Sequence, residues 1–417
     1  MAGLRKFMVV EDNDATMLFF SMALQDVGVK DAIQARTVDD ALAKYKELSP
    51  NYLIVSWELK TCPGTFLIQK LKALTKIKHV PFILYSKRLS PEDLVLLKEM
   101  GMDNILALPL AKEKASQEIL AMIKKEEEMP PEEITLRKIE AALKEQKPAD
   151  ALKYFDESLK KKGPYYVRAQ VLLGEIFIQT HDIPKAEQAY KAALGENPNS
   201  YDALSGLANV YSRLEQHEKA LKILTDLSQK SPKNINTMVN LGATYVQANR
   251  LTEAKQTFSK ISSIDPDAPG LKEEQSKAAF KEGDMGLAAK LIAETQQGDQ
   301  LARYFNNLAI SQSRRNDFNK AIETYQNAIK ILVNKAKLYA LRYNLGLAYV
   351  KKGDLQKGFV ELAASFKEDP SFEKAYAALV KCTKDMQAKG LTPDPQLVRD
   401  IKALRRPSGS GKPKKAS

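Results

Sequence analysis

Two adjacent carboxylates, Glu11 and Asp12, stand directly after the apolar run Phe7 to Val10. Carboxylate oxygens are hard ligands, so this pair could hold Mg²⁺. Two later apolar runs end in hydroxyl side chains, those of Ser56 and Ser86. A neutral serine hydroxyl is neither a hard metal ligand nor a nucleophile unless a base activates it. The residues themselves therefore offer weak metal binding and little covalent chemistry.

These polar residues all end short apolar runs that alternate with helical patterns up to about residue 130. Five such alternations predict a doubly wound parallel sheet with helices on both faces, and a site at the carboxyl ends of its strands. The expected strands are Phe7 to Val10, Ala32 to Ala35, Tyr52 to Val55, Val80 to Tyr85 and Ile105 to Ala107, and the expected helices begin near Asp14, Asp39, Thr65, Pro91 and Lys112.

Residues 4 to 126 resemble the receiver domain of bacterial response regulators, which has a flavodoxin-like α/β fold. The matches, in order along the chain, are the pair Glu11 and Asp12, then Gly64, Ser86 and Pro109. The resemblance implies that the acidic pair holds Mg²⁺. It also implies that the third strand ends in the aspartate that accepts a phosphoryl group, yet this chain carries Ser56 there.

Three further positions depart from the receiver pattern. Leu108 stands where the family has a lysine that pairs with phosphoryl oxygens, so an apolar side chain replaces a needed cation. Lys87 stands where the family has a small residue, and Ile105 replaces the aromatic ring that swings inward on activation. Together with Ser56, these losses favour a receiver fold that is kept as a binding platform.

Two alternatives remain open for this degenerate phosphorylation pocket. Ser56 could become a phosphoserine, or Glu58 could act as a substitute carboxylate, although strand alternation is expected to point Glu58 elsewhere. Glu11 and Asp12 could still hold Mg²⁺, but we expect a solvated remnant that caps the sheet.

Internal repetition at a 34-residue period follows an acidic, proline-marked joint at residues 127–131. Three units align as Gly174, Phe177, Ala186, Tyr190, Ala193 and Pro198, then Ala208, Tyr211, Ala220, Leu224, Leu227 and Pro232, then Gly242, Tyr245, Ala254, Phe258, Ile261 and Pro266. This spacing resembles the tetratricopeptide repeat, a pair of helices with small residues where the helices touch. The pattern weakens around Gly283 and then resumes, which implies about six to seven hairpins and a capping helix.

In the tetratricopeptide family the first helix of each hairpin lines a concave groove. Its exposed positions here are Asn209, Arg213, Asn240, Asn307, Arg314, Asn344 and Lys351. Asparagine amides can donate to and accept from an extended peptide backbone, and cations suit an acidic segment or a terminal carboxylate. We therefore predict proteins or extended peptide segments as partners, acidic ones included. The alternative for each asparagine is a side chain that faces water.

The composition of the chain argues against several classes of function. The formal net charge is +12, and much of the local excess lies in the last segment, where no aromatic residue interleaves the basic ones, so we do not predict nucleic-acid binding. Three scattered histidines and two distant cysteines, Cys62 and Cys382, suggest no enzyme, cofactor or small-molecule substrate. No apolar stretch reaches membrane-spanning length and the start does not resemble a signal peptide, so we expect a cytoplasmic protein.

The sequence thus predicts a receiver-like α/β domain with a five-stranded parallel sheet at 1–126 and a linker at 127–131. An all-α tetratricopeptide superhelix is expected at 132–388, and a basic, largely disordered tail at 389–417. The predicted function is a non-catalytic bacterial signalling scaffold that binds proteins through its repeat groove and a phosphorylation-independent receiver surface. The alternative is a regulator whose receiver responds to phosphorylation or metal and thereby controls partner binding by the repeats.

Overall fold

The computed structural model describes residues 5–60, 64, 67–68, 70, 81–99, 102, 104–155, 159 and 161–405. It begins with a five-stranded sheet whose neighbouring strands are all parallel, in the order β2-β1-β3-β4-β5. The strands are β1 (Phe7–Val10), β2 (Ile33–Ala35), β3 (Tyr52–Ser56), β4 (Phe82–Ser86) and β5 (Ile105–Ala107). The flavodoxin-like sheet expected from the alternating pattern is confirmed.

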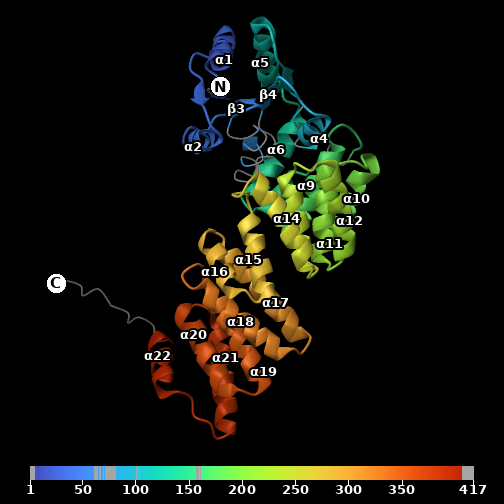
Figure 1. The fold of residues 1–417 in the computed structure, drawn as a ribbon. Coiled ribbons are helices and arrows are strands. Elements are labelled where there is room, and N and C mark those ends of the chain that lie inside the picture. Colours follow the sequence, from blue (N-terminus) through green and yellow to red (C-terminus); the bar gives the residue numbers. More distant parts are fainter. Residues whose placement is uncertain are drawn as a thin grey trace, which may run out of the picture. The chain divides into compact units, whose positions relative to one another are not determined.

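Helices cover both faces of this sheet, which is why β1, β3 and β4 are buried along their whole length. The helices are α1 (Asp14–Asp26), α2 (Val38–Leu48), α4 (Pro91–Glu99) and α5 (Lys112–Glu127). Phe7 and Val9 of β1 belong to a core shared with α1 and α5, whereas Met8 and Val10 belong to a core shared with α2 and α4. Figure 1 shows α1 and α5 on one side of the strands and α2 and α4 on the other. The helix expected near Thr65 begins outside the described residues.

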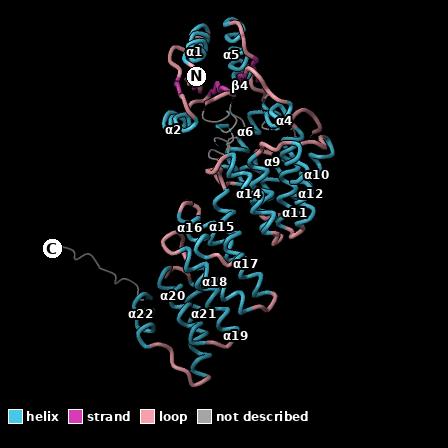
Figure 2. Tube along the Cα trace, in the orientation of Figure 1, coloured by secondary structure: helices cyan, strands magenta, loops and turns pink. Residues whose placement is uncertain are grey.

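Beyond β5 the described residues form helices and loops only, as Figure 2 shows. The helices succeed one another as pairs: α6 (Pro131–Lys144) with α7 (Pro148–Lys153), α9 (Tyr166–Gln179) with α10 (Ile183–Glu196), α11 (Tyr201–Arg213) with α12 (His217–Lys230), α13 (Ile235–Gln247) with α14 (Leu251–Ile264), α15 (Leu271–Glu282) with α16 (Met285–Ala293), α17 (Gly298–Arg314) with α18 (Phe318–Leu332), and α19 (Tyr339–Lys352) with α20 (Leu355–Glu368). The predicted closing helix is α21 (Glu373–Ala388).

Aromatic rings explain the small residues that recur in the repeats. A Cβ atom at Gly174 would lie 2.6 Å from the ring of Tyr190, and one at Gly206 would lie 2.3 Å from the same ring. A Cβ atom at Gly242 would likewise lie 2.3 Å from the ring of Phe258. Only glycine lets the helices approach this closely, because real side chains do not tolerate such distances.

The chain divides into two compact units, residues 1–271 and 272–417. The first holds the α/β domain and the repeats up to α14, and the second holds α16 to α21 and most of α15. One continuous superhelix was expected over 132–388. The division falls at the start of α15, the first helix of the repeat whose sequence pattern weakens around Gly283.

The segment predicted as a disordered tail differs in its first part. Residues Pro395–Arg405 form a helix, α22, in which Ile401 is buried against the core of α20 and α21. The remainder, 406–417, lies outside the described residues. None of the described helices combines the length and apolar character needed to cross a membrane.

Within the first unit, helix α4 contacts the loop that precedes α13. Nζ of Lys233 lies 2.6 Å from Oδ1 of Asp93, and Nδ2 of Asn234 donates to Oε2 of Glu99 at 3.0 Å. Asp93 is buried, and burial raises the pKa of its carboxyl, but hydrogen bonds from Lys233 and Ser90 outweigh this and leave the pKa below its ordinary value. This carboxylate therefore stabilises the contact in its charged form.

Lys233→Met is expected to lower the free energy of unfolding by about 1–2 kcal/mol, because a buried carboxylate loses a charged donor. Since the folded pKa of Asp93 is lowered, the stabilisation is present above the unfolded value of about 4 and fades as pH falls through the folded value. Urea denaturation followed by fluorescence of the single tryptophan, Trp57, measures the loss. The control is Lys222→Met, at an exposed position of α12. An equal loss in both variants would contradict the role given to the contact.

Candidate functional site

The carboxylates of the acidic pair at the end of β1 accept hydrogen bonds from other groups of the protein. Oε1 of Glu11 accepts hydrogen bonds from the backbone N–H groups of Asp12 and Asn13, each at 2.8 Å. Oε2 accepts from the hydroxyl of Tyr85 at 2.6 Å. Glu11 is only 3% exposed, so the expectation of a solvated remnant is wrong for this residue. Its carboxylate is instead part of the buried structure.

Tyr85 is the residue at this site that the sequence analysis missed. It lies beside Ser56, because β3 and β4 pair in the register that matches these two residues. Burial, followed by the hydrogen bond to Glu11, raises the pKa of the Tyr85 hydroxyl far above its ordinary value, while a hydrogen bond with Ser56 opposes this rise. The phenol therefore stays protonated and connects Glu11, which follows β1, with Ser56 at the end of β3. A buried tyrosine hydroxyl usually has a hydrogen-bond partner, and that tendency was the available signal.

The residues do not fit the Mg²⁺ site that the receiver resemblance implies. Both oxygens of Glu11 already accept hydrogen bonds, and Oδ2 of Asp12 accepts one from the backbone N–H of Lys60 at 2.6 Å. Ser56 is buried and contributes a neutral hydroxyl that hydrogen-bonds with Tyr85. Among the described residues, no group of three or more His, Cys, Asp and Glu side chains is arranged to hold a metal ion.

Glu58 lies against the end of β4 and not away from it as strand alternation suggested. Its Oε1 accepts from the hydroxyl of Ser86 at 2.6 Å and from the backbone N–H groups of Lys87 and Arg88 at 2.9 and 3.2 Å. Alternation fails here because Glu58 follows the strand, where the period-2 rule no longer applies. Through these hydrogen bonds the Glu58 carboxylate holds the loop after β4 in place, which is a structural role.

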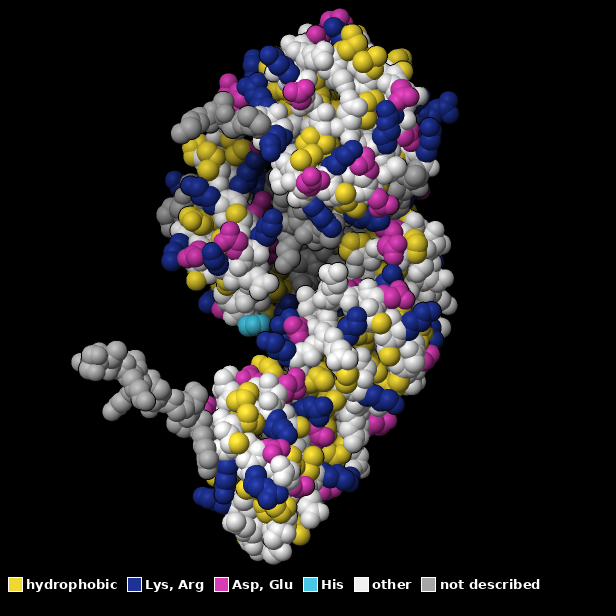
Figure 3. All heavy atoms as spheres, turned by 90° about the vertical axis from the view of Figure 1, so that its left-hand side faces the viewer, with side chains coloured by type: hydrophobic (Ala, Val, Ile, Leu, Met, Phe, Trp, Pro, Cys, Tyr) yellow, Lys and Arg dark blue, Asp and Glu magenta, His cyan; other side chains and the backbone are white. Residues whose placement is uncertain are grey.

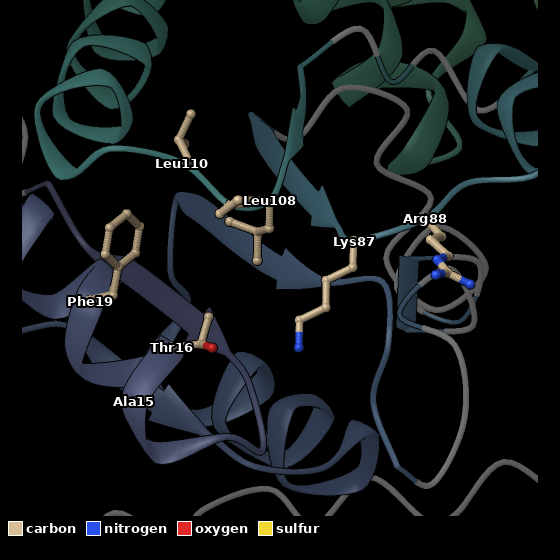
Figure 4. Close-up of a pocket in the computed structure, with 8 residues that line it drawn as sticks. Ala15, Thr16, Phe19, Lys87, Arg88, Leu108 and Leu110 are labelled. Atoms are coloured by element: carbon tan, nitrogen blue, oxygen red, sulfur yellow. The ribbon is translucent and has the colours of Figure 1, made fainter.

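The remaining residues that depart from the receiver pattern lie beside these groups. The side chains of Lys87 and Leu108 both line an adjoining cavity (Figure 4). Ile105 stands at the start of β5 and is partly buried. Lys87 is exposed and Leu108 is half-buried. The structure thus brings Glu11, Ser56 and Tyr85 together in one buried cluster and leaves Lys87 outside it.

Tyr85→Phe is expected to lower the free energy of unfolding by about 1–3 kcal/mol, because Oε2 of the buried Glu11 loses its hydroxyl donor. Urea denaturation followed by Trp57 fluorescence measures the change. Tyr52→Phe is the matched control, since Tyr52 is another buried strand tyrosine and no hydrogen bond of its hydroxyl is found among the described residues. The control should change the stability by less than about 0.5 kcal/mol. The interpretation fails if the two phenylalanine variants are equally stable.

In the first unit, the predicted groove residues lie on two neighbouring first helices. Asn209 and Arg213 of α11 and Asn240 of α13 are exposed, and these helices contact one another. Nε of Arg213 donates to Oδ1 of Asn209 at 3.0 Å, which leaves the other guanidinium nitrogens of Arg213 on the surface. The three side chains therefore offer amide and guanidinium groups on adjacent helices.

In the second unit, the predicted groove residues have different roles. Asn307, Arg314 and Lys351 are exposed on α17 and α19, and Nζ of Lys351 lies 5.9 Å from the ring centre of Phe318. Asn344 is half-buried, and its Nδ2 donates to Oδ1 of Asn306 at 2.8 Å. Asn344 thus joins two first helices, and the prediction that it is an exposed groove residue is wrong.

Charge on the surface is mixed. Figure 3 shows Lys and Arg side chains interspersed with Asp and Glu side chains on the drawn face of the described residues. Many of the cations are paired with acids close by in sequence, such as Lys185 with Asp182 and Lys191 with Glu187. This pattern is typical of solvated helix faces and differs from the single-sign stripe that binds nucleic acid.

Comparison with known proteins finds similarity both for the repeats and for the α/β domain. The tetratricopeptide-repeat family matches residues 136–201, 181–230 and 214–273. Over 130 residues the chain is 25% identical to the phosphate regulon transcriptional regulatory protein PhoB of Escherichia coli, covering 31% of this chain and 56% of PhoB. Over 182 residues it is 21% identical to the BBSome complex member BBS4 homolog of Drosophila melanogaster, covering 43% of this chain and 37% of that protein. The chain therefore spans only part of the length of these relatives.

Solved structures with similarity include a tetratricopeptide repeat protein from Parabacteroides merdae, with a TM-score of 0.40 and 15% identity over 61% of this chain and 98% of that one. The hetero-tetramer Cut9–Hcn1 of APC/C gives a TM-score of 0.42 and 14% identity over 78% of this chain and 61% of that one. The chain thus carries tetratricopeptide repeats behind an N-terminal five-stranded parallel α/β domain that matches the receiver region of PhoB.

Proposed function

We propose that this protein is a non-catalytic signalling scaffold whose receiver-like domain works without phosphorylation and whose repeats bind a partner protein. The observation that carries the proposal is the buried cluster of Glu11, Tyr85 and Ser56. In it, a tyrosine hydroxyl takes the carboxylate oxygen that a metal ion would need. A domain with this interior keeps the receiver fold as a rigid surface and supplies no phosphoryl acceptor.

Incubation of the full chain with Mg²⁺ and acetyl phosphate tests the first half of the proposal. We expect the intact mass to remain unchanged, while a response regulator with its acceptor aspartate gains one phosphoryl group in parallel. A phosphoryl adduct at Ser56 or Glu58 would support the alternative, a regulator that responds to phosphorylation. A Mg²⁺-dependent change in Trp57 fluorescence would support a regulator that responds to metal.

The partner half of the proposal rests on the repeats, which are a protein-interaction domain. We propose an extended, acidic peptide segment as the ligand of the first unit, because Arg213 and the amides of Asn209 and Asn240 lie exposed on adjacent first helices. Backbone groups of an extended peptide match asparagine amides, and an acidic side chain matches the guanidinium.

Affinity capture with the full chain tests this surface. Proteins retained by the wild type should be lost from Arg213→Glu, which reverses the charge at the proposed contact. Lys222→Glu is the matched control, because it makes the same charge change at an exposed position of α12, a second helix. If both variants retained the captured proteins equally, the binding site would not lie on the first helices of this unit.

A further inference from the structure

The α/β domain contains a cavity of about 540 Å³ at the carboxyl edge of its sheet. It is lined by Ala15, Thr16 and Phe19 of α1, by Lys87 and Arg88 after β4, and by Leu108, Pro109 and Leu110 after β5. Figure 4 shows the side chain of Lys87 extending toward Thr16, with Leu108 beside it and Phe19 on the far wall. Elements distant in sequence thus build one concave surface.

The lining combines apolar surface with unpaired positive charge. Phe19, Leu108 and Leu110 belong to the edge of the core that α1 and α5 share, so these walls are held in place by packing. Lys87 and Arg88 are exposed, and among the described residues neither side chain has an ion pair or hydrogen bond. No acidic residue lines the cavity.

Among the described residues, no carboxylate forms an ion pair with Lys87 or Arg88. Oε1 of Glu58 accepts the backbone N–H groups of Lys87 and Arg88, and Asp14 pairs with Arg36 at 2.5 Å. The ammonium group of Lys87 therefore remains available to a ligand beside an apolar wall, whereas Figure 4 shows the guanidinium of Arg88 directed away from Thr16 and Phe19. The first turn of α1 adds to this preference, because the amino end of a helix favours negative charge.

We infer that this cavity binds an amphipathic organic anion, a carboxylate attached to an apolar body. The carboxylate pairs with Nζ of Lys87, and the apolar body lies against Phe19, Leu108 and Leu110. The volume falls in the range of about 300–1,000 Å³ that is usual for small-molecule sites. The inference is independent of the proposed scaffold role, since it concerns neither phosphorylation nor the repeats.

Isothermal titration of the full chain with 2-naphthoate tests the inference, and 2-naphthylmethanol serves as the uncharged analogue. We expect saturable binding of 2-naphthoate with a dissociation constant of about 1 mM or below. The analogue should bind about fivefold more weakly, because it cannot form the ion pair with Lys87. Lys87→Met should weaken the binding of 2-naphthoate by the same factor.

Two more variants make the test decisive. Ala15→Phe places a ring in the cavity at an exposed position of α1. It should abolish the binding of 2-naphthoate and leave the urea denaturation curve, followed by Trp57 fluorescence, unchanged. Lys46→Met, at an exposed position of α2 outside the lining, should bind as the wild type does. The inference is overturned by equal affinity for the two naphthyl compounds, by unchanged binding in Ala15→Phe, or by no saturation up to about 10 mM.

Discussion

Ser56→Asp, which restores a carboxylate at the end of β3, is expected to lower the free energy of unfolding by about 3–5 kcal/mol at neutral pH. Ser56 is only 3% exposed and lies beside Tyr85, whose hydroxyl already donates to Glu11. A second carboxylate would be buried next to the first with no cation to pair with, because Leu108 stands at the family's lysine position. Ser56→Ala should cost far less, since it removes a hydroxyl and adds no charge.

The pH dependence of this loss has a definite sign. Burial and the neighbouring carboxylate raise the pKa of an introduced aspartate above its unfolded value. The loss is therefore small below the unfolded value of about 4 and grows as pH rises to the folded value. Urea denaturation at several pH values, followed by Trp57 fluorescence, measures it. If Mg²⁺ restored the stability of Ser56→Asp, Glu11 would be able to exchange the Tyr85 hydroxyl for a metal ion, which contradicts the structural role given to this hydrogen bond.

Gly298→Ala is expected to lower the stability of the second unit by about 3 kcal/mol. Gly298 is buried at the start of α17, and a Cβ atom there would lie 1.8 Å from the backbone carbonyl oxygen of Lys335. A carbonyl oxygen cannot turn aside as a flexible side chain can, so the backbone must shift, with the cost of about 1–3 kcal/mol that is typical of overpacking or somewhat more.

Hydrogen exchange on the full chain locates this loss. Amides of α17 to α19 should exchange faster in Gly298→Ala, while those of α9 to α14 should keep their protection, because these helices belong to different units. Gly286→Ala in α16 is the control, since its Cβ atom would meet only a side-chain oxygen of Asp284 at 3.6 Å. Alanine there should be neutral or stabilise by about 0.5–1 kcal/mol. Unchanged protection around Gly298 would mean that the chain relaxes there without cost.

Patterns with strong periodicity predicted the fold well. The five apolar runs became the five parallel strands with end shifts of at most two residues. The signal was strong for β1, β3 and β4, because these strands are buried along their whole length. The 34-residue spacing located the helix pairs, since small residues such as Gly174 and Gly242 face rings within the same hairpin.

Contacts between distant segments could not be predicted in this way. Asn344 pairs with Asn306 across two helices, and nothing local distinguishes it from the exposed Asn240. Tyr85 looks like any apolar strand residue until Glu11, at the end of another strand, is placed beside it. Helix α22 was missed because its composition is basic and Ile401 is its one fully buried residue among those described.

The hydrogen bond between Tyr85 and Glu11 also couples two positions of the sequence. An aspartate introduced at Ser56 is destabilising while the tyrosine is present, and loss of the tyrosine hydroxyl leaves Glu11 without a donor. Each of these changes made alone therefore gives a less stable protein. Residues 56 and 85 should consequently change together in related sequences, while exposed positions vary independently of them.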